Sequence, residues 1–316
     1  MRFVVRRVAV SLLLVWVVAS IVFLAIHLVP GDPAELLLST GGSAPDAATV
    51  AELRERLGLN LPLLTQYANF FAGLAHGDLG QSLVDDYPVL DEIGLRLPRT
   101  LELIAAGTIL ALIVSLPAGT YAALHQGGRF DRIASGIAAL VLAIPVFVVG
   151  TLLVLLMAQT LHLMPAGGYA PLAKAPGQHF LLLALPALAI GKGLAAILFR
   201  MTRASVLDVA VLDYVRTARA KGLSPNRVLI RHVLRNALSP ILTVLGLHMG
   251  SLLGGTVLVE YVFNWPGLST PLLRAVEARD YPMVVGIVLV ISALFLAINL
   301  VTDLTRAALD PRIHTA

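Results

Sequence analysis

Long apolar segments separated by shorter polar ones run along most of the chain. Six of these segments hold about 20 mainly apolar residues, the length that an α-helix needs to cross a bilayer. The predicted spans are residues 8–29, 101–123, 133–161, 180–199, 237–262 and 283–304. The third is long enough to tilt, or to end in a turn that does not cross. Prolines within the spans predict kinks at Pro117, Pro145 and Pro186.

The composition agrees with a membrane protein. The chain has 316 residues, a mean hydropathy of +0.86, 58% hydrophobic residues and 13% charged residues. An ordinary soluble domain carries about 25% charged residues, so that class is excluded. Cysteine is absent, which excludes disulfides, thiolate metal sites and a cysteine nucleophile. The sequence therefore predicts an all-α membrane protein with six transmembrane helices.

The placement of Lys and Arg predicts the orientation of these helices. With the amino terminus in the cytoplasm, fifteen of these cations lie on the cytoplasmic side and seven outside, and Lys192 lies within a span. Both termini are then cytoplasmic and residues 30–100 form an external loop. Because the basic isoelectric point near 9.6 reflects this distribution by membrane side, nucleic acid is not an expected partner.

The first span follows Arg2, Arg6 and Arg7, as the apolar part of a signal peptide would. Its apolar run is longer than that of a typical signal peptide, and no small-residue cleavage site closes it. We therefore expect a retained helix.

The external loop carries helical signals of its own. Asp46 is placed to cap a helix that Gly58 ends, and Pro62 is placed to start a second helix. The second helix has an apolar face formed by Leu63, Tyr67, Phe70, Phe71 and Leu74. A small helical cap of this kind either docks a soluble protein or packs on the spans as a lid.

The polar segment between the fourth and fifth spans, residues 213–240, predicts two helices that meet at a sharp corner. Gly222 has the position of a left-handed helix C-cap, Ser224 that of an N-cap and Pro225 that of a first helical residue. Six cations accompany the single acid Asp213: Arg216, Arg219, Lys221, Arg227, Arg231 and Arg235. This elbow is either a handle on which a partner acts or a solvated basic loop that obeys the positive-inside rule.

Few residues within the spans have side chains that could bind a substrate, a metal ion or a proton. Lys192 is a candidate for the translocation pathway, and its structural alternative is a lysine paired with a carbonyl or carboxylate. Gly246, Gly250 and Gly254 let helices approach closely, either at a subunit interface or pathway or within the monomer. His248 lies inside this repeat and is either a substrate or metal contact or a hydrogen-bonded structural residue.

No catalytic constellation accompanies these residues. The AIGKG segment at residues 189–193 lacks the glycine spacing and the Ser or Thr of a phosphate loop. Glu260, at the end of the fifth span, is expected to be interfacial, and His162 and His179 lack metal-ligand spacing. We expect no cofactor, no metal and no enzymatic activity from this chain.

Nine ordered motifs resemble those of a known family. They are PGDP (30–33), LGLNLPLLTQY (57–67), HGDLGQS (76–82), LPRTLEL (97–103), DYVRTARAKGLS (213–224), LRNALSP (234–240), WPG (265–267), RDYP (279–282) and LDPRI (309–313). Over essentially its whole length the chain resembles the B-type permease of peptide/nickel ABC importers. The resemblance implies the type I importer permease fold. Its expected parts are a first helix at 1–29, an external loop at 30–100, a core at 101–305 with a coupling loop at 200–236, and a cytoplasmic tail at 306–316.

The resemblance also implies partners in the bacterial inner membrane. These are a second homologous permease, two ATP-binding subunits and an external substrate-binding protein. The first helix of the elbow is then the part that docks on an ATP-binding subunit, through Tyr214, Arg216, Thr217, Ala218, Lys221, Gly222 and Leu223. Only Ala218 and Gly222 match the letters of the general EAA pattern, and Arg235 stands where that pattern has proline.

The expected function is ATP-driven import of peptides by alternating access. Import of nickel or a metal chelate is the alternative, because the connection between the third and fourth spans is short and His248 lies in the fifth span. An ion-coupled secondary transporter, which needs several intramembrane acids or histidines, and a membrane enzyme are the remaining classes.

Overall fold

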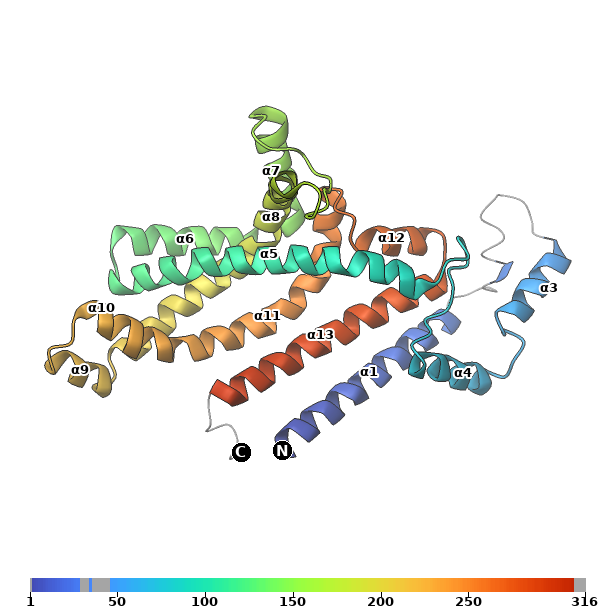
Figure 1. Cartoon of the computed structure of the whole chain (residues 1–316), viewed down its shortest axis with the longest axis horizontal. Coiled ribbons are helices and arrows are strands. Elements are labelled where there is room, and N and C mark those ends of the chain that lie inside the picture. The colour runs from blue at the N-terminus through green and yellow to red at the C-terminus, as the bar shows by residue number, and fades with distance from the viewer. Residues whose placement is uncertain (1, 29–33, 36–45, 310–316) are drawn as a thin grey trace. The chain divides into compact units, whose positions relative to one another are not determined.

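The computed structural model describes residues 2–28, 34–35 and 46–309, and the elements of this part of the chain are helices (Figure 1). No β-strand is present in these ranges. The elements are α1 (Arg2–Leu28), α3 (Ala47–Arg56), α4 (Leu63–Ala75), α5 (Val89–Leu124), α6 (Arg129–Ala143), α7 (Val146–Leu153), the π-helix η2 (Val154–Thr160), α8 (Pro176–Ala210), α9 (Asp213–Ala220), α10 (Pro225–Val228), the π-helix η3 (Leu229–Leu234), α11 (Arg235–Val262), α12 (Ser269–Glu277) and α13 (Tyr281–Leu309).

The described residues hold five helical segments that are long and apolar enough to cross a bilayer, or six if one bent helix pair counts as a span, so the prediction of an all-α membrane fold is confirmed. Five are single helices that are long and apolar enough to cross a bilayer. The sixth is the pair formed by α6 and the α7–η2 segment, which bends by 104° at Pro145. By contrast, α5 and α8 continue as helices through Pro117 and Pro186.

The second span differs from its predicted boundary. Hydropathy places its start at residue 101, whereas α5 begins at Val89. The first turns of α5 carry Asp91, Glu92 and Arg96, so they are helical but too polar for the hydrocarbon core. Hydropathy detects the part of a helix that suits the membrane, and this part is shorter than the helix itself.

The chain divides into two compact units. The first unit comprises Met1–Val8, Arg99–Pro266 and Phe295–Ala316, and the second comprises Ala9–Pro98 and Gly267–Leu294. In the first unit, α8 packs against α6, α7 and α11. Helix α8 also lies close to α5, where a Cβ on Gly107 of α5 would lie 2.5 Å from the Ile190 side chain of α8. The α5–α8 contact therefore depends on the missing side chain at Gly107.

In the second unit, apolar side chains of α1, α4 and α13 form one cluster. Phe70, Phe71 and Leu74 of α4 pack on Ala19 of α1 and Leu289 of α13. The two helices predicted within residues 30–100 are thus present, and α4 packs on α1 and α13, which is the packing expected of the lid alternative.

The ends of these two short helices agree closely with the sequence signals. Asp46 is the N-cap residue of α3, and Gly58 follows that helix with a φ of +66°. Pro62 is the N-cap residue of α4 rather than its first helical residue.

Candidate functional site

The corner of the elbow is a Schellman motif built on Gly222. The Gly222 N–H donates to the Arg219 carbonyl at 3.0 Å, and the Leu223 N–H donates to the Ala218 carbonyl at 3.4 Å. Gly222 has a φ of +77°, so the predicted left-handed conformation is confirmed. A Cβ at this position would meet no heavy atom within 4 Å. The requirement for glycine here is therefore one of backbone conformation and not of space.

The second arm of the elbow begins as predicted. Ser224 is its N-cap residue, with an extended backbone, and Pro225 is in its first turn. The four-residue helix α10 passes without a break into the π-helix η3 and then into α11. The corner is thus joined by continuous helix to the fifth span.

One face of α9 is buried inside the elbow. Val215 is 0% exposed and Ala218 is 6% exposed. Both belong to an apolar cluster with Val206 of α8, Val228 of α10 and Val233 of η3. Ala218, which the resemblance places among the docking residues, therefore packs in the core of the elbow, where its small side chain helps to position α9.

The opposite face of α9 is exposed and basic. Tyr214, Arg216, Thr217, Lys221 and Gly222 are exposed, and Leu223 is half-buried. All six cations of the segment are exposed, while Asp213 lies 3.6 Å from Arg216. The Tyr214 hydroxyl donates to the His232 carbonyl of η3 at 3.4 Å. The elbow thus presents a positively charged surface on a rigid apolar core.

An ion pair that the sequence did not reveal holds α8 shortly before the elbow. Arg203 donates to both carboxylate oxygens of Asp131 in α6, at 2.5 and 2.8 Å. The Gly127 N–H donates to the same carboxylate at 2.8 Å. Asp131 is only 3% exposed. Because a bidentate pair fixes both distance and angle, it ties the α5–α6 connection to α8.

Lys192 caps the broken helix α6. Its ammonium donates to the carbonyls of Val141 at 2.9 Å and Ile144 at 2.5 Å. Residue 145 is proline and has no N–H, so the Val141 carbonyl has no helical partner four residues later. The structural alternative for Lys192, pairing with carbonyls, is therefore the one that this geometry supports.

The glycine repeat of α11 divides between two roles. A Cβ on Gly246 would lie 1.9 Å from Thr302, and one on Gly250 would lie 2.3 Å from Phe295. These two glycines therefore allow α11 to approach α13 within the monomer. Gly254 is exposed and has open space around it, and His248 is half-buried.

Glu260 is buried, so the expectation that it is interfacial is wrong. It is 1% exposed and accepts a hydrogen bond from the Thr100 hydroxyl of α5 at 2.6 Å. Nearby in the sequence, the Trp265 indole donates to the Arg99 carbonyl at 2.9 Å. The end of α11 is thus fastened to α5 by polar contacts, which replace the water that an interfacial acid would have.

His179 is a second buried polar residue that its sequence context did not identify. Its Nε2 lies 2.8 Å from a carboxylate oxygen of Glu102, and its Nδ1 lies 2.7 Å from the Ala170 carbonyl. The ring is 1% exposed. Each ring nitrogen is therefore within hydrogen-bond distance of an oxygen atom, which fixes the orientation of the ring. Among the residues that the structure describes, no group of three or more His, Asp or Glu side chains is placed to hold a metal ion.

Several long apolar helices, with a basic elbow on an apolar core between two of them, are the architecture of a multi-pass membrane protein. The chain belongs to the family described as binding-protein-dependent transport system inner membrane component, whose model matches residues 115–315. The model of the N-terminal part of such membrane components matches residues 1–104. The resemblance found in the motifs is thereby confirmed, and the chain is an ABC importer permease.

Named relatives match over nearly the full length. The chain is 40% identical over 314 residues to the glutathione transport system permease protein GsiC of Escherichia coli O6:H1 strain CFT073, covering 99% of both chains. It is 39% identical over the same length to the protein of that name from Escherichia coli strain K12, again with 99% of both covered.

A solved structure supports the fold. The inward-facing MetNI methionine ABC transporter matches with a TM-score of 0.57 and 16% identity, over 70% of this chain and 97% of the other.

Proposed function

We propose that this chain imports peptides across the bacterial inner membrane by alternating access, as one half of a permease pair. A second homologous permease supplies the other half, two separate ATP-binding subunits hydrolyse ATP, and an external binding protein delivers the substrate. The elbow carries this proposal, because an exposed basic face on a rigid core is a surface on which a partner can push.

The packing suggests how a displacement of the elbow by an ATP-binding subunit is transmitted to the transmembrane helices. Val215 of α9 contacts the cluster that contains Val206 of α8, and η3 leads directly into α11. A displacement of α9 is therefore transmitted to the fourth and fifth spans together. Helices that move as rigid bodies about a central pathway produce alternating access.

The orientation follows from the distribution of cations. We propose that both termini and the elbow are cytoplasmic and that residues 30–100 face the binding protein. Exposed Tyr214, Arg216, Thr217 and Lys221 are the proposed contacts with the ATP-binding subunit, and Ala218, Gly222 and Leu223 shape the helix that carries them. For the pathway, Gly254 is the strongest of the proposed residues, because it is exposed and has open space around it, whereas Lys192 and Gly250 have contacts within the monomer. His248 remains a proposed pathway residue beside it in the repeat.

The relatives favour peptides over nickel as the substrate class. Their names specify glutathione transport, and glutathione is a tripeptide. Family membership also removes the ion-coupled secondary transporter from consideration. We therefore propose small peptides, glutathione included, as the cargo.

The test is direct measurement of the cargo. The cognate binding protein is titrated by calorimetry with glutathione, dipeptides, tripeptides and nickel salts, and the complete complex is assayed for uptake in proteoliposomes. Binding and ATP-dependent uptake of a peptide support the proposal. Binding of nickel or a nickel chelate alone, with no peptide bound or transported, contradicts it.

A further inference from the structure

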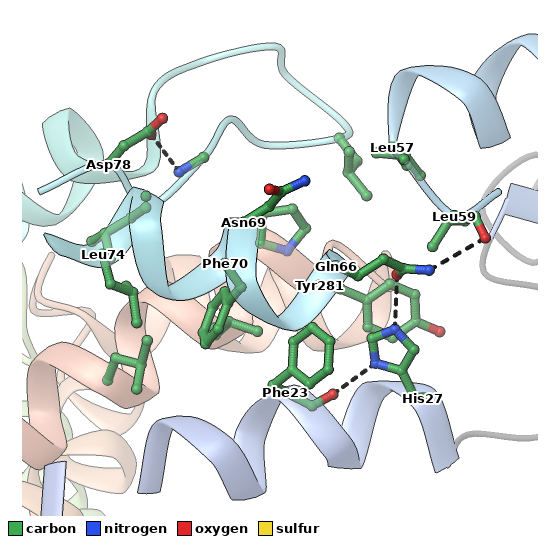
Figure 2. Close-up of a pocket in the computed structure, with 18 of the residues that line it drawn as sticks. Phe23, His27, Leu57, Leu59, Gln66, Asn69, Phe70, Leu74, Asp78 and Tyr281 are labelled. Atoms are coloured by element: carbon green, nitrogen blue, oxygen red, sulfur yellow. Dashed lines mark hydrogen bonds between the residues drawn. The ribbon is translucent and has the colours of Figure 1, made fainter. Parts of the chain in front are cut away.

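The second unit contains a cavity of about 370 Å³ at one end of α1 (Figure 2). Its lining comes from the last turns of α1, the connection between α3 and α4, α4 itself, residues 78–83 and the first turns of α13. This volume is within the range of about 300–1,000 Å³ that small-molecule sites have in proteins. The cavity is therefore large enough to hold a ligand and not merely a few water molecules.

The walls of the cavity are mostly apolar. Phe23 of α1, Phe70 and Leu74 of α4, and Val285 and Leu289 of α13 are among its lining residues. A peptide placed against such walls would leave its backbone amide groups without hydrogen-bond partners, at a considerable cost in free energy. A hydrocarbon chain has no such groups, so the walls favour an aliphatic ligand.

One group of polar residues on the lining is joined by hydrogen bonds, while Asp78 lies apart from this group and accepts from the Gly80 N–H at 2.8 Å (Figure 2). Gln66 donates to the carbonyls of Leu61 at 2.8 Å and Leu59 at 3.3 Å, and its oxygen lies 3.1 Å from His27 Nε2. Figure 2 shows this chain of hydrogen bonds beside the Tyr281 ring. Asn69, also on the lining, is exposed. The site is thus apolar inside with a rigid polar edge, which suits an amphiphile.

The position of the cavity along α1 indicates which amphiphilic molecule is available to enter it. The cavity is lined by Phe23 and His27, which lie in the last two turns of α1 and near the carboxyl end of the span predicted at residues 8–29. Leu13 and Ile21 of α1 are exposed apolar residues, as expected of a helix that borders lipid. The cavity therefore lies at the depth where acyl chains give way to headgroups.

We propose that this cavity binds one acyl chain of a membrane phospholipid, with the headgroup beside His27, Asn69 and Tyr281. The bound chain fills a space between α1, α4 and α13 that protein side chains leave open. This site is separate from the elbow and does not depend on which cargo is transported.

The test uses the complete complex and takes advantage of the absence of cysteine from this chain. Asn69→Cys on the cavity lining and Leu13→Cys on the lipid-facing side of α1 are each labelled with bimane. The complex is reconstituted with phosphatidylcholine carrying a brominated acyl chain, which quenches bimane on contact. It is then exchanged into detergent that contains no brominated lipid.

We expect the label at Asn69 to remain quenched after the exchange, because its lipid is held, while the label at Leu13 recovers. Gly73→Leu, which adds a side chain to the cavity lining, should abolish the retained quenching in an assembled complex. Recovery of both labels overturns the proposal, as does quenching that survives Gly73→Leu. Release of the quenching by glutathione or a dipeptide also overturns it, since the cavity then belongs to the cargo. Native mass spectrometry of the unmodified complex provides a check without any variant, with a retained brominated lipid expected and its absence contradicting the proposal.

Discussion

Ser82 donates a hydrogen bond to the buried carboxylate of Asp280, although the two residues are 198 positions apart in the sequence. Asp280 also accepts from the backbone N–H groups of Leu83 at 3.2 Å and Met283 at 3.4 Å. It is 3% exposed and immediately precedes the last transmembrane helix. The HGDLGQS and RDYP motifs are therefore two halves of one contact, which joins the segment after α4 to the start of α13.

Ser82→Ala should destabilise the protein by about 1.5–3 kcal/mol, because a buried carboxylate loses a hydrogen bond. The measurement is the thermal unfolding midpoint of the purified complex. Ser292→Ala is the matched control, since the Ser292 hydroxyl bonds only to the Val288 carbonyl one turn earlier in its own helix, within the described contacts. Equal midpoints for the two variants would contradict the importance of the Ser82–Asp280 contact.

Gly222→Val should impair coupling between ATP hydrolysis and uptake. A β-branched residue at a φ of +77° is strained by about 1–2 kcal/mol or more, so the corner relaxes to another shape. Gly222→Asn is the control, because asparagine tolerates the left-handed conformation. Copurification of the ATP-binding subunits and uptake by the complex are measured. Normal assembly and transport by Gly222→Val would show that the corner has no coupling role.

Lys192→Met should destabilise the broken span by leaving two carbonyl groups without their donor, at about 1–3 kcal/mol for each group that stays unsatisfied. The penalty should shrink in a Pro145→Ala background, because an alanine at that position restores an N–H for the Val141 carbonyl. A double-mutant cycle on thermal stability measures this coupling. If the two substitutions are additive, Lys192 does not act through the break at Pro145.

Arg203→Lys should weaken the tie between α6 and α8 although the positive charge is retained. An ammonium cannot make the two parallel bonds that the guanidinium makes to Asp131. We expect a lower unfolding midpoint, and Asp131→Asn should add little further loss in the Arg203→Lys background. Independent, additive losses would indicate that the pair does not act as a unit.

The proposed orientation is tested with single cysteines. Leu64 of α4 is 83% exposed, and Arg219 lies on the exposed face of α9. In intact spheroplasts, a membrane-impermeant maleimide should label Leu64→Cys and should label Arg219→Cys only after the membrane is opened. The reverse pattern would invert the topology.

The sequence was sufficient for features that a few neighbouring residues determine. The Gly222 corner, the Ser224–Pro225 start and the span cores all depend on local backbone conformation or local hydropathy. Partners across the fold were not predictable in this way. The sequence showed that Lys192 is a charged residue within a span, but it did not show which carbonyl groups bind it. In the same way, the sequence around Glu260 did not predict its hydrogen bond with Thr100. Short-range patterns carry no information about which helix faces pack together.

The Schellman corner separates the shape of the elbow from its surface chemistry. Its geometry depends on one glycine conformation and on the small buried residues Val215 and Ala218. Arg216 and Thr217 are exposed to solvent, and their printed side-chain contacts are with Asp213 at the start of α9, away from the Gly222 corner. Under the proposed docking role, substitutions on the exposed face would change which partner surface is recognised and would leave the shape of the elbow unchanged. Departures from the EAA letters at Arg216 and Thr217 therefore cost the fold little.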